Sequence, residues 1–273
     1  MNTMNLRPLS LGEILDRTFT LYKSNIVLFA ALAGIPRIPA LALGLIQVQG
    51  LVQGKSFFDP TSLLLTLAAY VLGIAGYVYS QGSSVITVSE IYLGRSITIE
   101  EALRRVSRDF WSLLGVVVLS TLAIGFGFLL LVIPGVILTC RLFVCIPVAM
   151  VERKGPSDTF SRSMALTKGF AGRAAVIILL FFALAFGFGL ILQLPLTLLA
   201  REEGGGLNLT IASFLAVANA IVSALLTPIL LIATSIYYYD LRVRKEAFDL
   251  HMMMDPEGTH VPRMGAPSVV PEG

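Results

Sequence analysis

Residues 174–199 read AAVIILLFFALAFGFGLILQLPLTLL, a run without a charged residue in which Gln193 and Thr197 are the hydrogen-bonding side chains. As an α-helix these 26 residues would extend about 39 Å, which exceeds the roughly 30 Å hydrocarbon core of a bilayer. The apolar residues are continuous and do not alternate with polar ones. The run therefore predicts a transmembrane helix and not a strand of a membrane barrel.

Five further blocks of the 273-residue chain share this character. Hydrophobic residues make up 56% of the sequence and charged residues 14%, with a mean hydropathy of +0.83, whereas soluble domains carry about 25% charged residues. The six blocks are residues 26–48, 62–88, 111–133, 136–151, 174–199 and 211–238. We predict an all-α polytopic bundle of six transmembrane helices, formed by residues 1–245 as one domain. Residues 246–273, rich in Met, Pro and Gly, are predicted to be a disordered cytoplasmic tail.

The basic residues give the bundle an orientation, because Lys and Arg are retained on the cytoplasmic side of a membrane. Sixteen of the 20 fall in four segments on one side of the predicted spans. They are Arg7, Arg17, Lys23, Arg95, Arg104, Arg105, Arg108, Arg153, Lys154, Arg162, Lys168, Arg173, Arg242, Arg244, Lys245 and Arg263. The chain is therefore predicted to be a multi-pass protein of a bacterial plasma membrane with both termini in the cytoplasm. The net charge of +3 follows from this bias and does not indicate nucleic-acid binding.

The fourth block is the weakest span. It has 16 residues, and Arg141 and Pro147 interrupt it. A central Arg costs about 2.5–3.5 kcal/mol on insertion scales, so the sequence leaves open whether this block crosses the membrane or is re-entrant. Pro134-Gly135 is predicted to form the external turn before it, because Pro ends a helical ladder and Gly accepts positive φ.

Three short amphipathic helices are predicted on the cytoplasmic side, before spans one, three and five. They comprise residues 10–23, 98–109 and 156–168. Ser10 and Glu13 have the spacing of a capping box, and Thr98 and Glu101 repeat it. Each helix carries an acid four residues before an Arg: Glu13 and Arg17, Glu101 and Arg105, Asp158 and Arg162. The pattern indicates three internal units, each an interfacial helix plus two spans; the alternative is that loops entering a membrane are commonly amphipathic and basic.

The same residues carry a family resemblance. The opening Arg7-Pro-Leu-Ser-Leu-Gly-Glu-Ile-Leu-Asp-Arg-Thr-Phe-Thr-Leu-Tyr-Lys-Ser-Asn, and Val132-Ile-Pro-Gly in the middle, resemble bacterial proteins grouped with the glycerophosphoryl diester phosphodiesterase membrane domain. The likeness covers roughly residues 7 to 245. In members that are phosphodiesterases the chemistry belongs to a separate soluble barrel, and nothing like that barrel is present. The resemblance therefore implies a stand-alone membrane module and not an enzyme.

The residue types that could carry chemistry lead to the same expectation. His251 and His260 both lie in the tail, and two His without a nearby Cys make an incomplete metal set. Cys140 and Cys145 are five residues apart within an apolar block and are expected to be buried free thiols. No hydrolase, metalloprotease or phosphate-loop motif occurs. We expect no catalytic residues, no cofactor and no metal.

Ionisable groups within the membrane are the remaining candidates for a ligand site. Arg37 interrupts span one between two prolines, Arg141 interrupts span four, and Glu152 lies at the cytoplasmic end of span four, as Glu90 and Asp240 do for spans two and six. One hypothesis is a polar cavity in which Arg37 or Arg141 binds an anionic headgroup or solute. The alternative is that both arginines snorkel to the external interface or pair structurally. Trp111 and Tyr237-Tyr238-Tyr239 are predicted to anchor helices as a cytoplasmic aromatic belt.

The sequence favours a non-enzymatic membrane scaffold or envelope-support module. A transporter or binder of a lipid or small anionic solute is the alternative, favoured by the repeats and the intramembrane arginines. The lipid bilayer is the expected partner, with other membrane proteins or further copies of the chain left open.

Overall fold

The computed structural model describes residues 8–54, 56–92, 94–199 and 209–246, which are helical throughout apart from short turns and contain no strand. This confirms the all-α prediction. Six helical stretches are long and apolar enough to cross a membrane, by length and composition. They are Ile26–Gly50, Pro60–Tyr92, Ile99–Leu130, Val132–Glu152, Ala171–Ile191 and Ser213–Glu246. Except for Glu246, the predicted tail lies outside the described residues, as do His251 and His260.

The first span is broken at the two prolines that flank Arg37. Helix α2 (Ile26–Gly34) passes through a 3-10 turn, η1 (Ile35–Arg37), into α3 (Ile38–Val52). Helix α4 (Pro60–Tyr92) packs against this turn through Gly76, where a Cβ atom would clash with the carbonyl group of Pro36. A glycine is required here because the two backbones touch.

Two of the three amphipathic helices are separate elements. Helix α1 (Leu11–Ser24) begins with the predicted capping box: the Glu13 amide donates to Ser10 Oγ at 3.2 Å, and the Ser10 amide donates to Glu13 Oε2 at 2.7 Å. Helix α8 (Pro156–Thr167) begins at Gly155 without a side-chain cap. The predicted separate helix over residues 98–109 is wrong, because helix α5 (Ile99–Leu130) continues from it into the third span. Nothing between Asp109 and Trp111 breaks the helical ladder.

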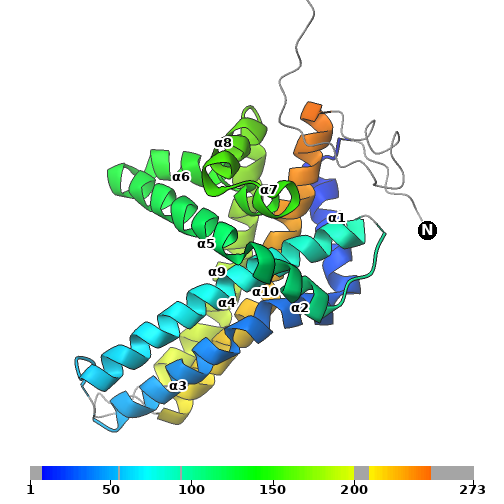
Figure 1. The fold of residues 1–273 in the computed structure, drawn as a ribbon. Coiled ribbons are helices and arrows are strands. Elements are labelled where there is room, and N and C mark those ends of the chain that lie inside the picture. Colours follow the sequence, from blue (N-terminus) through cyan, green and yellow to red (C-terminus); the bar gives the residue numbers. More distant parts are fainter. Residues whose placement is uncertain (1–7, 55, 93, 200–208, 247–273) are drawn as a thin grey trace, which may run out of the picture.

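Helices α5 and α6 (Val132–Arg141) form a hairpin whose turn lies at Leu131, which has extended backbone. The predicted turn at Pro134-Gly135 is wrong. A proline in the interior of a helix would interrupt it, but Pro134 lies in the first turn of α6, where an amide has no intrahelical partner to lose. Gly135 packs within the hairpin against the ring of Phe128. Figure 1 shows the hairpin projecting away from the arm that α3 and α4 form with α10.

The fourth span is two short helices. Helix α6 ends at Arg141, and helix α7 (Cys145–Glu152) begins after a turn at residues 142–144. Cys140 and Cys145 on either side of that turn are buried free thiols, as the sequence predicts. The break divides the span, so neither helix alone has the length of a membrane crossing.

Helices α9 (Ala171–Leu199) and α10 (Leu209–Glu246) form the last pair. Helix α10 is the central element, because it contacts α1, α2, α3, α4, α7, α8 and α9. Its C-terminal part is the most buried portion of the core, with Tyr237 and Tyr238 at 0% exposure. In Figure 1 this end of α10 lies in the upper part of the molecule with α1 and α8, opposite the connection between α3 and α4.

Candidate functional site

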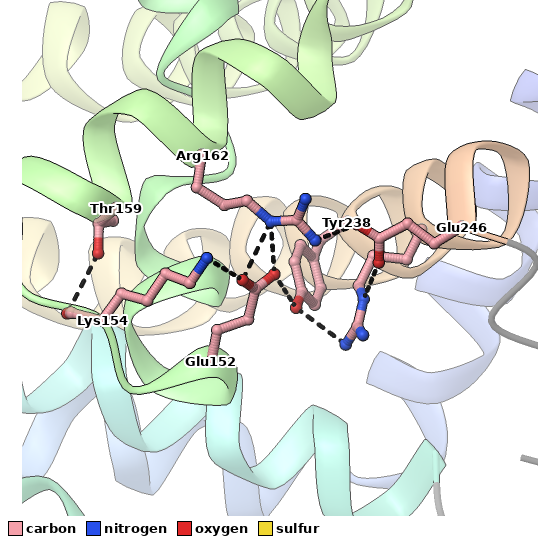
Figure 2. Close-up of polar contacts among 7 residues, drawn as sticks. Glu152, Lys154, Thr159, Arg162, Tyr238 and Glu246 are labelled. Carbon is pink, nitrogen blue, oxygen red and sulfur yellow. Dashed lines mark hydrogen bonds and ion pairs between the residues drawn. The ribbon is translucent and has the colours of Figure 1, made fainter. Parts of the chain in front are cut away.

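Glu152 belongs to a closed ring of polar side chains that joins α7, α8 and α10 (Figure 2). Arg162 Nε donates to Glu152 Oε2 at 3.0 Å, and the other end of its guanidinium pairs with Glu246. Arg242 links Glu246, at 3.0 Å, to the hydroxyl of Tyr238, at 3.3 Å. Tyr238 closes the ring by donating to Glu152 Oε1 at 3.0 Å.

A third cation, Lys154, pairs with Glu152 beside this ring. Lys154 Nζ lies 3.1 Å from Glu152 Oε2, so three cations face two carboxylates. Burial, the largest influence, lowers the pKa of Arg162, but its hydrogen bonds and charge contacts with Glu246 and Glu152 outweigh burial and leave that pKa raised. Glu152 is therefore saturated by protein partners, and its position fits a structural role better than the predicted ligand-binding one.

Glu90 at the end of α4 is held in a similar way. Arg105 of α5 donates to Glu90 Oε1 at 2.5 Å and to Glu101 Oε1 at 2.7 Å. The second contact is the predicted pair four residues apart. Glu101 thus turns toward Arg105, while Thr98 accepts a bond from the Glu101 amide at 3.3 Å. The predicted second capping box is confirmed in this amide-to-hydroxyl half.

Asp240 of α10 holds Leu9, just before α1. Its side chain is fully buried and accepts from Arg173 and Arg244, each at 2.9 Å, and from the amide of Leu9 at 2.7 Å. The same two guanidinium groups donate to the carbonyl oxygen of Leu9, at 2.7 and 2.6 Å. Both backbone polar groups of Leu9 are therefore satisfied by α9 and α10, which fixes the entry to α1.

These three acids occupy equivalent places in the predicted repeat. Each ends the second span of a unit and binds the beginning of the next unit, and Asp240 of the last unit returns to the first. The helix starts align at three positions, with caps at Ser10, Thr98 and Gly155, acids at Glu13, Glu101 and Asp158, and arginines at Arg17, Arg105 and Arg162. We call Glu90, Glu152 and Asp240, with the arginines Arg105, Arg162, Arg173 and Arg244, the collar. The aligned starts and the collar contacts support the three-unit interpretation.

The tyrosines predicted as an aromatic belt belong to the interior beside the collar. Tyr237 donates to the carbonyl of Phe170 at 2.8 Å, and Tyr239 stacks on Tyr92 with ring centroids 5.1 Å apart. These tyrosines are buried, whereas Trp111 is 80% exposed and remains available to a membrane interface. The sequence of three consecutive tyrosines does not show whether they are buried or interfacial. An aromatic ring with a hydroxyl suits both a membrane interface and a buried position with a hydrogen-bond partner.

Arg141 lies against α8 through its backbone. Its carbonyl oxygen, freed by the break after α6, accepts the hydroxyls of Ser163 and Thr167 at 2.8 and 3.0 Å. Its positive charge acts on Lys245, as do those of Lys168 and Arg162. Arg141 therefore belongs to the end of the molecule that carries the collar.

Arg37 has a separate environment. Its guanidinium carbon lies 5.7 Å from the ring centroid of Tyr77, and the residue is half-buried. Within the described residues no ion pair links Arg37 to a carboxylate. The three predicted candidates Arg37, Arg141 and Glu152 therefore do not form one site.

Tyr77 lines a groove of about 640 Å³ between α3, α4 and α5. Its wall contains five hydrogen-bonding side chains, Gln47, Thr66, Tyr70, Tyr77 and Thr121, among apolar residues and one glycine. Gln47 donates to Thr66 at 2.5 Å. The groove has the mixed lining of a site for an amphiphile, and no local sequence pattern marks it because its walls come from distant segments.

No cluster of three or more His, Cys, Asp or Glu side chains that could hold a metal ion occurs in the described part of the chain. Comparisons with family models, with curated proteins and with solved structures find no match. The resemblance to the glycerophosphoryl diester phosphodiesterase membrane domain therefore stays a prediction.

Proposed function

We propose that this chain is a non-enzymatic multi-pass protein of a bacterial plasma membrane that binds an anionic lipid in the groove between α3, α4 and α5. The observation that carries the proposal is Arg37. Its half-buried guanidinium stacks on Tyr77 at the wall of the groove and has no carboxylate partner among the described residues. An anionic headgroup is the ligand chemistry that such a cation binds.

Energetics favour a ligand at this position. A charged side chain near the centre of a bilayer costs about 2.5–3.5 kcal/mol on insertion scales, and an anionic group beside it offsets part of that cost. A volume of about 640 Å³ also lies within the range of roughly 300–1,000 Å³ of small-molecule sites. The apolar walls supply contacts for acyl chains, and the hydroxyls of Tyr70, Tyr77 and Thr121 can bond ester or headgroup oxygens.

The charge distribution supports an orientation with the collar on the cytoplasmic side and the loop between α3 and α4 outside. Reporter fusions after Gly54, Gly155 and Gly205 test it. We expect outside, inside and outside signals, respectively. A cytoplasmic signal at Gly205 would contradict a six-span topology.

Lipid identification in native-lipid nanodiscs tests the groove. The wild type is expected to retain a specific anionic lipid that Arg37→Gln loses, while Arg108→Gln, which removes an exposed arginine of α5 as a matched charge control, keeps it. Thr121→Trp fills the groove from α5 and is expected to expel the lipid. Leu119→Trp, on the same helix but outside the groove lining, serves as its control. If Arg37→Gln and Thr121→Trp both retain as much of the lipid as the wild type does, the proposal is refuted.

A scaffold is the second candidate function, and the collar favours it. The contacts between Asp240 and Leu9 join the entry to α1 to the last helix, α10. The collar end would therefore offer another protein a surface formed by both ends of the bundle. A stoichiometric protein partner that co-purifies with both wild type and Arg37→Gln, with no specific lipid in either, would support the scaffold instead.

A further inference from the structure

Three cations from three elements converge on the last turn of α8. Lys168 directly follows that helix, and Lys245 of α10 donates its Nζ to the carbonyl oxygen of Ala165 at 2.5 Å. Arg141, which ends α6, is tied to the same turn because its carbonyl accepts the hydroxyls of Ser163 and Thr167. The positive charges of Lys168, Arg162 and Arg141 lie close enough to act on Lys245, and of these Arg162 is paired with Glu152 and Glu246.

These cations differ from the arginines of the collar. The collar arginines each bind a carboxylate, but no ion pair to Arg141, Lys168 or Lys245 is found within residues 8–246 as described. The nearby acids Glu152, Glu246 and Asp240 are already engaged by arginines. The last turn of α8 therefore carries an excess of positive charge that a bound anion would offset.

The surroundings of these cations are amphipathic. Lys168 and Lys245 are exposed and Arg141 is half-buried, while the Nζ of Lys245 lies 5.9 Å from the centroid of the Phe170 ring. The apolar helix α9 begins directly after Phe170. A cationic rim above an apolar helix matches the arrangement by which basic pockets at helix ends hold acidic lipid headgroups.

We propose that Arg141, Lys168 and Lys245 form a site for a phosphate group, provided by the headgroup of an anionic phospholipid at the collar end of the molecule. The site shares no residue with the groove beside Arg37, so the two proposals stand or fall separately. Free phosphate offers the same chemistry, and the experiment distinguishes the two sources.

The test is a titration of the full chain in detergent micelles with phosphatidylglycerol, phosphatidylcholine or inorganic phosphate, with bound species resolved by native mass spectrometry. Lys168→Gln combined with Lys245→Gln is expected to weaken phosphatidylglycerol binding at one site by roughly 30-fold. Lys23→Gln combined with Arg108→Gln removes the same charge from exposed positions elsewhere at the predicted cytoplasmic side and is expected to leave that site nearly unchanged.

The outcomes separate the interpretations. Equal weakening in both double variants, or equal affinity for phosphatidylcholine, would refute the site. Saturable binding of inorganic phosphate that the lysine variant loses, without phosphatidylglycerol binding, would assign the site to a soluble phosphate. Lys168→Gln alone, an exposed change expected to preserve the fold, is expected to weaken binding by several-fold. Retention of a groove lipid by these variants would show that the groove proposal is unaffected.

Discussion

Arg105 donates to Glu90 Oε1 at 2.5 Å across the connection between α4 and α5. The acid ends one unit of the repeat, and the arginine lies in the first helix of the next. Arg162 and Glu152 repeat the relationship at 3.0 Å, one unit further along the chain. A contact that recurs at equivalent positions indicates that the units are held to one another at the collar.

Asp240→Asn is expected to destabilise the protein strongly. The side chain of Asp240 is fully buried, and its loss of charge leaves Arg173 and Arg244 facing each other without a carboxylate. Breaking a buried pair costs about 3–5 kcal/mol, toward the lower end here because both arginines are partly exposed. Thermal unfolding in detergent measures the change. Asp16→Asn, an exposed acid of α1, is the control, and an equal shift in both variants would contradict the role of Asp240.

The pair of Glu90 and Arg105 is expected to contribute less. The side chain of Arg105 is 40% exposed, so solvent screens the interaction and a coupling energy of about 0.5–1 kcal/mol is expected. A double-mutant cycle with Glu90→Gln and Arg105→Gln gives this value from unfolding free energies. The same cycle on Asp240 and Arg173 gives the comparison. Equal coupling energies for the two pairs would show that exposure does not determine how much each collar contact contributes to stability.

Gly76→Ala is expected to disturb the broken first span, whereas Gly73→Ala on the same helix is not. A Cβ at Gly76 would clash with the carbonyl of Pro36, which is backbone and cannot rotate away, at a cost of about 1–3 kcal/mol. A Cβ at Gly73 would lie 3.8 Å from the Cβ of Ala40, an ordinary contact. The two variants are compared by thermal unfolding, and equal stability would show that α4 does not touch the turn.

Ser163→Ala combined with Thr167→Val is expected to lower the stability of the protein by removing the bonds that hold α8 to the break in the fourth span. Both hydroxyls donate to the carbonyl oxygen of Arg141, and removing them leaves a partly buried acceptor without these bonds, at a cost of about 1 kcal/mol. Ser163→Ala alone is expected to cost less, because Thr167 keeps its bond. Unfolding free energies of the single and double variants check this order, and additive small effects would contradict a shared acceptor.

Local signals in the sequence were sufficient for several features. The capping box at Ser10 and Glu13 and the buried state of Cys140 and Cys145 were both predicted. Each depends on residues within about one helical turn or on the length of an apolar block. The absence of a helix breaker after Asp109 was also a local fact, but the amphipathic stripe before it suggested a separate element.

Apolar length, composition and the alternation of basic segments determined the six hydrophobic helical stretches, because burial in a bilayer depends on how many consecutive residues lack charge. The tertiary structure decided what the polar residues do. Glu152 binds Arg162, Arg141 lies against α8, and the groove at Tyr77 has walls from α3, α4 and α5. These relationships join residues on different helices. The packing of helices brings such residues together, and no local sequence pattern encodes it.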